Sequence, residues 1–289
     1  MIHIKNTSLK VGYAGLIVIL ALTLPVLLFE NSDLMAEQPL YRHVLQACLV
    51  GLIAIVGIWL VRTKSDTYWP RSFGLARPNK AFGQFLFGFG LIAVPLLITI
   101  SLSVLFDWTD ISFNVTSGIL VAAVIGLVST FFTDAITEEL IFRGYIFGMI
   151  KMRSNTWKSS LITTALFVVF PIIVITIQDL IGIASTMPLS VGYLFTLLFF
   201  GSFVQYLRVL TGSIWTGVGF HLFFVQMNQL IGITDTSFIQ FSETGSELPF
   251  QITLVVLLLF VLTGLVIYSI RNKRKNRVIA HKSINLTKK

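Results

Sequence analysis

The sequence predicts an all-α protein, a polytopic membrane bundle of about eight transmembrane helices with both termini in the cytoplasm. Composition is the first observation behind this prediction. Hydrophobic residues make up 55% of the 289 residues and charged residues only 12%, and the mean hydropathy is +0.86. Soluble domains carry about 25% charged residues, so we expect lipid rather than water to surround most of the chain.

The second observation is a series of apolar stretches, each long enough to cross the hydrocarbon core as a helix of about 20 residues. They are residues 11–29, 44–61, 81–105, 116–150, 159–181, 189–207, 212–233 and 250–270. The stretch 116–150 exceeds one crossing, so we expect it to tilt, bend or continue along the cytoplasmic surface. The stretch 212–233 is the least apolar. No small-residue cleavage pattern follows 11–29, which we interpret as a retained span.

The third observation is the distribution of basic residues, which gives the orientation. All but two of the 21 Lys and Arg residues lie before the first span, after the last, or in alternate loops; the exceptions are Arg42 and Arg143. The opposite loops carry most of the acidic residues. An even number of spans with both termini in the cytoplasm satisfies this pattern.

The net charge of +8 does not indicate a nucleic-acid partner. A cluster of basic residues follows directly on the last apolar span, where it can lie against anionic lipid headgroups. These residues are Arg271, Lys273, Arg274, Lys275 and Arg277. We expect the lipid bilayer, and no nucleic acid, as the partner of this tail. A single cysteine, Cys48, excludes a disulfide within the chain.

The basic loop WPRSFGLARPNK is the clearest connector and suggests the domain organisation. Residues 1–71 hold two leading spans and the start of this loop. Residues 72–233 form a core that, with the last span to residue 270, contains six spans. Residues 271–289 form the basic tail.

Asp134, Glu138, Glu139 and Arg143 lie within the fourth apolar stretch, in TDAITEELIFRGYIFG. Each charge in the middle of a membrane costs about 2.5–3.5 kcal/mol on insertion scales, so such residues indicate a function or a buried ion pair. On a helix, residues four apart share a face, which pairs Glu139 with Arg143 and aligns Asp134 with Glu138. The two glutamates point about 100° apart and need different partners. The pattern alone leaves a structural ion pair and a functional site both open.

Glu138-Glu139-Leu-Ile-Phe-Arg143-Gly144 resembles the EExxxR signature of the CAAX protease and bacteriocin-processing (CPBP/Abi) family of intramembrane endopeptidases. FGLARP is similar to the segment that precedes the core in many bacterial members, and TGSIWTGVGFH, which ends at His221, is similar to a later block. The resemblance covers roughly residues 72–230. It implies a bacterial plasma-membrane protein of bacteriocin processing or immunity, with a membrane-bound peptide or protein as substrate or partner.

The resemblance also implies the roles of individual residues. The first glutamate, Glu138, would activate a water for attack on a peptide bond, with His221 in the same site. Glu139, paired with Arg143, would give structural support. A carboxylate can take a proton from water, and hydrogen-bond donors can stabilise the oxyanion that forms.

The sequence departs from the family pattern at two positions. The second block, FxxxH, would align Phe167 with a histidine at position 171, where this chain has Pro171. The third block continues to an asparagine at the position of Val225. Asn228 is a secondary candidate, but it lies seven residues after His221, about 10.5 Å along the helix axis. We expect Pro171 to kink its helix and so to widen a groove beside Glu138.

The departures bear on cofactors. A catalytic zinc site needs three protein ligands and one open position. Glu138 and His221, with Asp134 as a secondary candidate, are the ligands that the chain could offer, and no HExxH or paired-histidine spacing accompanies them. We therefore expect no cofactor, and a zinc site remains the alternative.

Three functions fit the sequence. The incomplete catalytic set favours a pseudo-protease that binds and regulates, or processes, a membrane-bound peptide or protein. The alternative is an active endopeptidase that uses Glu138 and His221 to activate water. A cation-coupled transporter is a third reading, based on Asp134 with Glu138, but there is no repeat of halves to support it.

The charge pattern predicts the outcome of a topology experiment. Alkaline phosphatase fused after Lys289 should be inactive, and a green fluorescent protein fused at the same point should fluoresce, because that end lies in the cytoplasm. Fusions within the loop 235–247 should give the reverse. Active phosphatase at Lys289 would overturn the predicted orientation.

Overall fold

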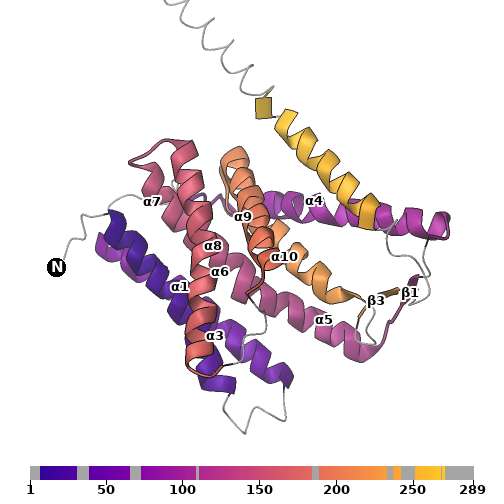
Figure 1. The fold of residues 1–289 in the computed structure, drawn as a ribbon, viewed down its shortest axis with the longest axis horizontal. Helices are drawn as coiled ribbons and strands as arrows, with labels where there is room; N and C mark the ends of the chain where they lie inside the picture. The colour runs from indigo at the N-terminus through magenta and orange to yellow at the C-terminus, as the bar shows by residue number, and fades with distance from the viewer. Residues whose placement is uncertain are drawn as a thin grey trace, which may run out of the picture. The chain divides into compact units, whose positions relative to one another are not determined.

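The structure is a computed structural model that describes residues 7–30, 39–65, 73–108, 111–183, 189–232, 237–241, 251–267 and 269–270. At residues 30, 39, 40, 62–65, 228–230, 232 and 241 it describes the backbone alone. The described residues are almost entirely helical (Figure 1), which confirms the predicted all-α class.

The helices follow one another with short connections. They are α1 (Thr7–Glu30), α3 (Pro39–Ser65), α4 (Pro78–Leu105), α5 (Ser117–Thr130), η1 (Phe131–Ala135), α6 (Ile136–Glu138), η2 (Glu139–Ile146), α7 (Phe147–Lys151), α8 (Thr156–Leu180), α9 (Val191–Thr211) and α10 (Trp215–Leu230), followed by an apolar helix, Gln251–Ile267. Three short strands are β1 (Ile111–Phe113), β2 (Ile231–Gly232) and β3 (Ile239–Phe241). β2 and β3 pair in parallel, with Ile231 opposite Ile239.

Six helices in the described part of the chain are long and apolar enough to cross a membrane. They are Thr7–Phe29, Tyr41–Val61, Pro78–Leu105, Ser117–Lys151, Thr156–Leu180 and Val191–Thr211. The two remaining predicted spans correspond to α10, of 16 residues, and to the shorter helix Gln251–Ile267. The polytopic helical bundle is thus confirmed. Residues 1–6 and 271–289 lie outside the described residues, so the orientation of the termini stays a prediction.

The chain divides into two compact units. One contains residues 1–90 and 113–240, and the other contains residues 91–112 and 241–289. All candidate site residues belong to the first unit. Within it, α1 lies beside α3 (Figure 1) and also contacts α8, where the Gln178 side chain donates to the Leu22 carbonyl at 3.2 Å.

The predicted long fourth span is one helical run from Ser117 to Lys151. Thr116 precedes its first residue, and the Thr116 hydroxyl caps the helix by accepting from the Ile119 N–H. Two segments of this run, η1 and η2, have the wider π-helical turn. Such turns add a residue to the helix and are frequent at functional sites. They contain Asp134, Glu139 and Arg143, three of the four ionisable residues of the motif.

α8 runs unbroken from Thr156 to Leu180 with Pro171 inside it. Pro171 has no N–H to donate to the preceding turn, but the helix does not end there. The predicted widening of a groove beside Glu138 by this proline remains a prediction.

Two glycines allow α4 and α10 to cross in backbone contact. A Cβ atom at Gly88 would collide with the Thr216 carbonyl oxygen, and one at Gly219 would collide with the Phe85 carbonyl oxygen. Small residues permit such approaches between membrane helices. Close packing follows, with Phe89 edge-on to Phe223 at 4.3 Å between ring centroids. The crossing fixes the position of α10 against α4 at Gly219, which lies within the family-like block that ends at His221.

This crossing can be tested with matched alanines. Gly219→Ala should lower the thermal stability of the detergent-solubilised protein, by about 1–3 kcal/mol in unfolding free energy, because the backbone of α4 must move. Gly83→Ala on α4 should leave stability nearly unchanged, since nothing lies within 4 Å of its Cβ position. Equal melting temperatures for the two variants would show that the helices do not cross at Gly219.

Candidate functional site

A buried ion pair joins Glu139 to Arg143, the pair that their spacing predicted. Arg143 Nη1 donates to Glu139 Oε1 at 3.0 Å, and both side chains are 0% exposed. In a medium of low dielectric constant, neither charge is stable without its partner. The pair therefore lies wholly inside the protein rather than against lipid.

Arg143 is also held by α8 and α9. Its Nη2 donates to the Gly201 carbonyl at 3.1 Å, and its guanidinium lies 4.0 Å from the centre of the Phe167 ring. Stacking of a guanidinium on an aromatic face adds favourable cation–π energy. One arginine thus connects three helical segments.

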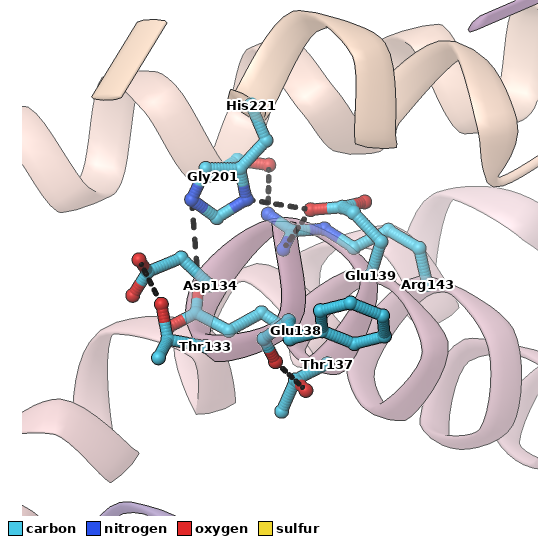
Figure 2. A network of polar contacts seen from close by, with 9 residues as sticks. Thr133, Asp134, Thr137, Glu138, Glu139, Arg143, Gly201 and His221 are labelled. Carbon is cyan, nitrogen blue, oxygen red and sulfur yellow. Dashed lines mark hydrogen bonds and ion pairs between the residues drawn. The ribbon is translucent and has the colours of Figure 1, made fainter. Parts of the chain in front are cut away.

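His221 lies between the two glutamates (Figure 2). Its Nδ1 is 3.4 Å from Glu139 Oε1, and its Nε2 is 3.9 Å from Glu138 Oε2. The imidazole packs edge-on against Phe200, with 4.6 Å between ring centroids. The structure thus brings the two residues that the sequence proposed as a catalytic pair, Glu138 and His221, to one place.

The two adjacent glutamates differ in their exposure. The Glu138 side chain is 17% exposed, whereas that of Glu139 is sealed at 0%. Glu139 is balanced by Arg143, so Glu138 is the carboxylate that a water or a ligand can reach. Their directions differ, as the helical spacing predicted.

Asp134 lies on the same side of the site as Glu138. The Thr133 hydroxyl donates to its Oδ2 at 2.6 Å (Figure 2), and Asp134 interacts electrostatically with both Glu138 and His221. The charged groups therefore form one cluster of Asp134, Glu138, Glu139, Arg143 and His221.

Two glycines that sequence reasoning did not single out make room for this cluster. A Cβ at Gly217 would stand 2.6 Å from Glu139 Oε2, and one at Gly201 would stand 2.7 Å from the Phe167 ring. Gly217 lies four residues before His221 and so shares its helical face. This spacing from His221 could have identified Gly217 as a site residue. No sequence pattern pointed to Gly201.

Arg208 is a third residue that the sequence did not single out. Its position just after the apolar stretch 189–207 predicted a cytoplasmic loop residue, but Arg208 lies in α9. It is 5% exposed, and its Nε donates to the Arg143 carbonyl at 3.0 Å. Its guanidinium also lies against Gly74, which takes a positive φ of 70° and where a Cβ would approach to 2.5 Å. The family-like segment FGLARP also packs directly on the site helix, where the Phe73 ring lies 5.5 Å from the Tyr145 ring between centroids.

The positions that depart from the family pattern offer no replacement for the missing groups. Pro171 lies within α8 and Val225 within α10. The backbone of Asn228 continues α10, and its side chain lies outside the described residues. Its role as a secondary candidate therefore stays a prediction.

The described residues do not fit a three-ligand zinc site. Within the described ranges, no group of three or more His, Cys, Asp or Glu side chains is placed to hold a metal ion.

Fold and site together define a multi-pass helical membrane protein with a buried cluster of glutamate, arginine and histidine. Residues 120–227 match the family model of the type II CAAX prenyl endopeptidase Rce1-like proteins. This match confirms the resemblance to the CAAX protease and bacteriocin-processing family over the segment that carries the site. No curated protein and no solved structure matches the chain.

Removal of Arg143 should destabilise the protein. Arg143→Ala leaves Glu139 buried without its partner, which typically costs about 3–5 kcal/mol, so we expect a lower membrane level and a lower melting temperature. Arg153→Ala, which changes an exposed arginine just after α7, should alter neither. Immunoblots of membranes and thermal-shift measurements report both effects; unchanged abundance with lost function would assign Arg143 to chemistry instead.

Proposed function

We propose that the protein hydrolyses a peptide bond in a membrane-bound peptide or protein, with Glu138 as general base and His221 as its partner. The observation that supports this proposal is the arrangement of His221, which has Glu139 on Nδ1 and the more exposed Glu138 opposite Nε2. Activation of a water requires a base within hydrogen-bond reach of it and a further group that orients the two. Here Glu138 would be the base and His221 the orienting group.

Glu138 is suited to take the proton of water. Its carboxylate is partly accessible and not bonded to Arg143, which is engaged by Glu139. The water oxygen bonds to the peptide carbonyl carbon as its proton passes to Glu138. The proton then goes to the peptide nitrogen as the carbon–nitrogen bond breaks, which restores the carboxylate and releases an acid and an amine. General-base catalysis of this kind contributes about 10²–10⁴-fold in rate.

His221 is suited to position that water. The 3.9 Å between its Nε2 and Glu138 Oε2 is too long for a direct hydrogen bond and fits a water that bridges the two groups. A hydrogen bond from Nδ1 to Glu139 would fix the imidazole ring and leave Nε2 to accept a hydrogen bond from the water. Glu139 and Arg143 thus act as positioning residues.

The membrane surroundings favour a substrate that is itself in the membrane. The carboxylates and Arg143 of the site lie in a helical run, Ser117–Lys151, that is long and apolar enough to span the bilayer, and proteins of the matched family are endopeptidases by description. A peptide segment of a membrane protein or a membrane-anchored peptide can reach such a site, and we place the protein in the bacterial plasma membrane. The proposed reaction uses no cofactor.

A second candidate function is binding without cleavage. It is favoured by Pro171 and Val225, which stand where the family pattern has a histidine and an asparagine. A pseudo-protease would hold the same membrane-bound segment near Glu138 and regulate it. The two functions make different demands on Glu138, because only hydrolysis needs its carboxylate to accept a proton.

Mass spectrometry of protein termini separates the two. Membranes are compared from a deletion strain that carries the wild type, Glu138→Gln or an empty vector. We expect a terminus that the wild type produces and the other two lack. Asp179→Asn, which changes an exposed carboxylate near the end of α8, should retain that terminus at equal protein abundance.

The contrary result is equally clear. If no terminus depends on Glu138 while Glu138→Gln still complements the deletion, the protein binds its partner without cutting it. The glutamine keeps the size and hydrogen-bonding capacity of the side chain, so a loss of folding is not expected to confuse the comparison.

A further inference from the structure

Tyr193 at the start of α9 is a polar group that neither the motif nor the family blocks include. Its side chain is half-buried, and it interacts electrostatically with both Glu138 and Asp134. Its position on α9 can be traced through the contacts that this helix makes along its length.

α9 runs parallel to the helix that carries the charges. Near the end of α9, Arg208 bonds to the Arg143 carbonyl and lies over the Phe147 ring. Seven residues earlier, Gly201 bonds to the Arg143 side chain. Each step back along α9 therefore corresponds to a step back from Phe147 through Arg143 toward Glu139.

Tyr193 continues this register by two further turns. It lies seven residues before Phe200, the ring that packs on His221, and residues seven apart lie on the same face of a helix, about 10.5 Å apart along its axis. That step leads from the level of His221 to the turn of Asp134 and Glu138. The register of α9 and the electrostatic interaction of Tyr193 therefore both place this residue at the level of Asp134 and Glu138.

The same register relates Tyr193 to the missing histidine. α8, in contrast, runs antiparallel to α9, because Gln205 bonds to Ser160 at 3.3 Å and Phe200 contacts Phe167 at 6.0 Å between centroids. Four residues beyond Phe167, Pro171 is therefore level with about Thr196. Tyr193 is the next residue on that side of α9, within one turn of the place where the family pattern has its histidine.

We propose that Tyr193 is a further catalytic residue of this site, whose phenol donates a hydrogen bond to the oxyanion formed from the peptide carbonyl. This inference rests on the proposed hydrolysis. A phenol is an established type of oxyanion donor. In the resting site the phenol interacts electrostatically with the carboxylates of Asp134 and Glu138. Once Glu138 has taken the proton of water, that carboxyl no longer competes as an anionic acceptor, and the phenol can turn to the new oxyanion.

Tyr193 would supply a hydrogen-bond donor near the position where the family pattern has a histidine and this chain has Pro171. Two carboxylates and one imidazole supply acceptors and one donor, whereas a tetrahedral intermediate develops negative charge that needs donors. A tyrosine from the neighbouring helix supplies one without restoring the lost histidine.

The first measurement concerns placement and is independent of activity. The full-length protein in lipid nanodiscs carries 3-fluorotyrosine at residue 193 or, in a separate sample, at residue 206 on the same helix. We expect the fluorine resonance of residue 193 to move in Glu138→Gln and in Asp134→Asn, and that of residue 206 to stay. An unmoved resonance at residue 193 in both variants would overturn the inference, even if Glu138 proves essential for cleavage.

The second measurement concerns chemistry. Tyr193→Phe removes one hydroxyl and should slow formation of the Glu138-dependent terminus by about 100-fold, the usual cost of one oxyanion donor, at equal abundance and melting temperature. Tyr206→Phe, the same change on the same helix, should leave the rate unaltered. Cleavage at the wild-type rate in Tyr193→Phe would exclude the donor role. If no terminus depends on Glu138, the donor role falls with the proposed function, and the fluorine spectra still decide where the phenol lies.

Discussion

The ion pair between Glu139 and Arg143 is the interaction on which the rest of the site depends. Both side chains are fully buried, and in such surroundings each charge is tolerated only with its partner. The pair fixes more than itself, because Arg143 bonds to Gly201 on α9 and stacks on Phe167 of α8, while Glu139 faces His221 on α10. Three helices are thus brought to one point by two charges that a membrane interior would otherwise exclude.

The pair also explains why two adjacent carboxylates can serve different purposes. Arg143 balances Glu139, so the charge of Glu138 is left to be met by His221, by water or by a ligand. A single carboxylate could not be both neutralised by the arginine and available to react. The two adjacent glutamates therefore have separate roles. Glu139 is sealed inside the protein, whereas the side chain of Glu138 is 17% exposed.

Close backbone packing gives the charges their positions. Gly217 leaves room for the Glu139 carboxylate, Gly201 for Phe167 and Arg143, and the Gly88–Gly219 crossing fixes α10 against α4. Membrane helices gain little from the hydrophobic effect when they associate, so small residues and polar contacts decide how they pack. The π-helical turns of η1 and η2 further set the directions in which Asp134, Glu139 and Arg143 leave the helix.

Hydropathy and one motif were enough to predict the helical spans and the charged pair of the site. The helical spans follow from the cost of exposing backbone polar groups to lipid, which leaves a helix as the only open choice for an apolar stretch of about 20 residues. The pairing of Glu139 with Arg143 follows from their spacing of four. Contacts between segments distant in the sequence could not be predicted, because no local sequence pattern indicates them. They include the approach of His221 to both glutamates, the burial of Arg208 in α9 and the electrostatic interaction of Tyr193 with Asp134 and Glu138. All three depend on the register between helices, and only tertiary packing decides that register.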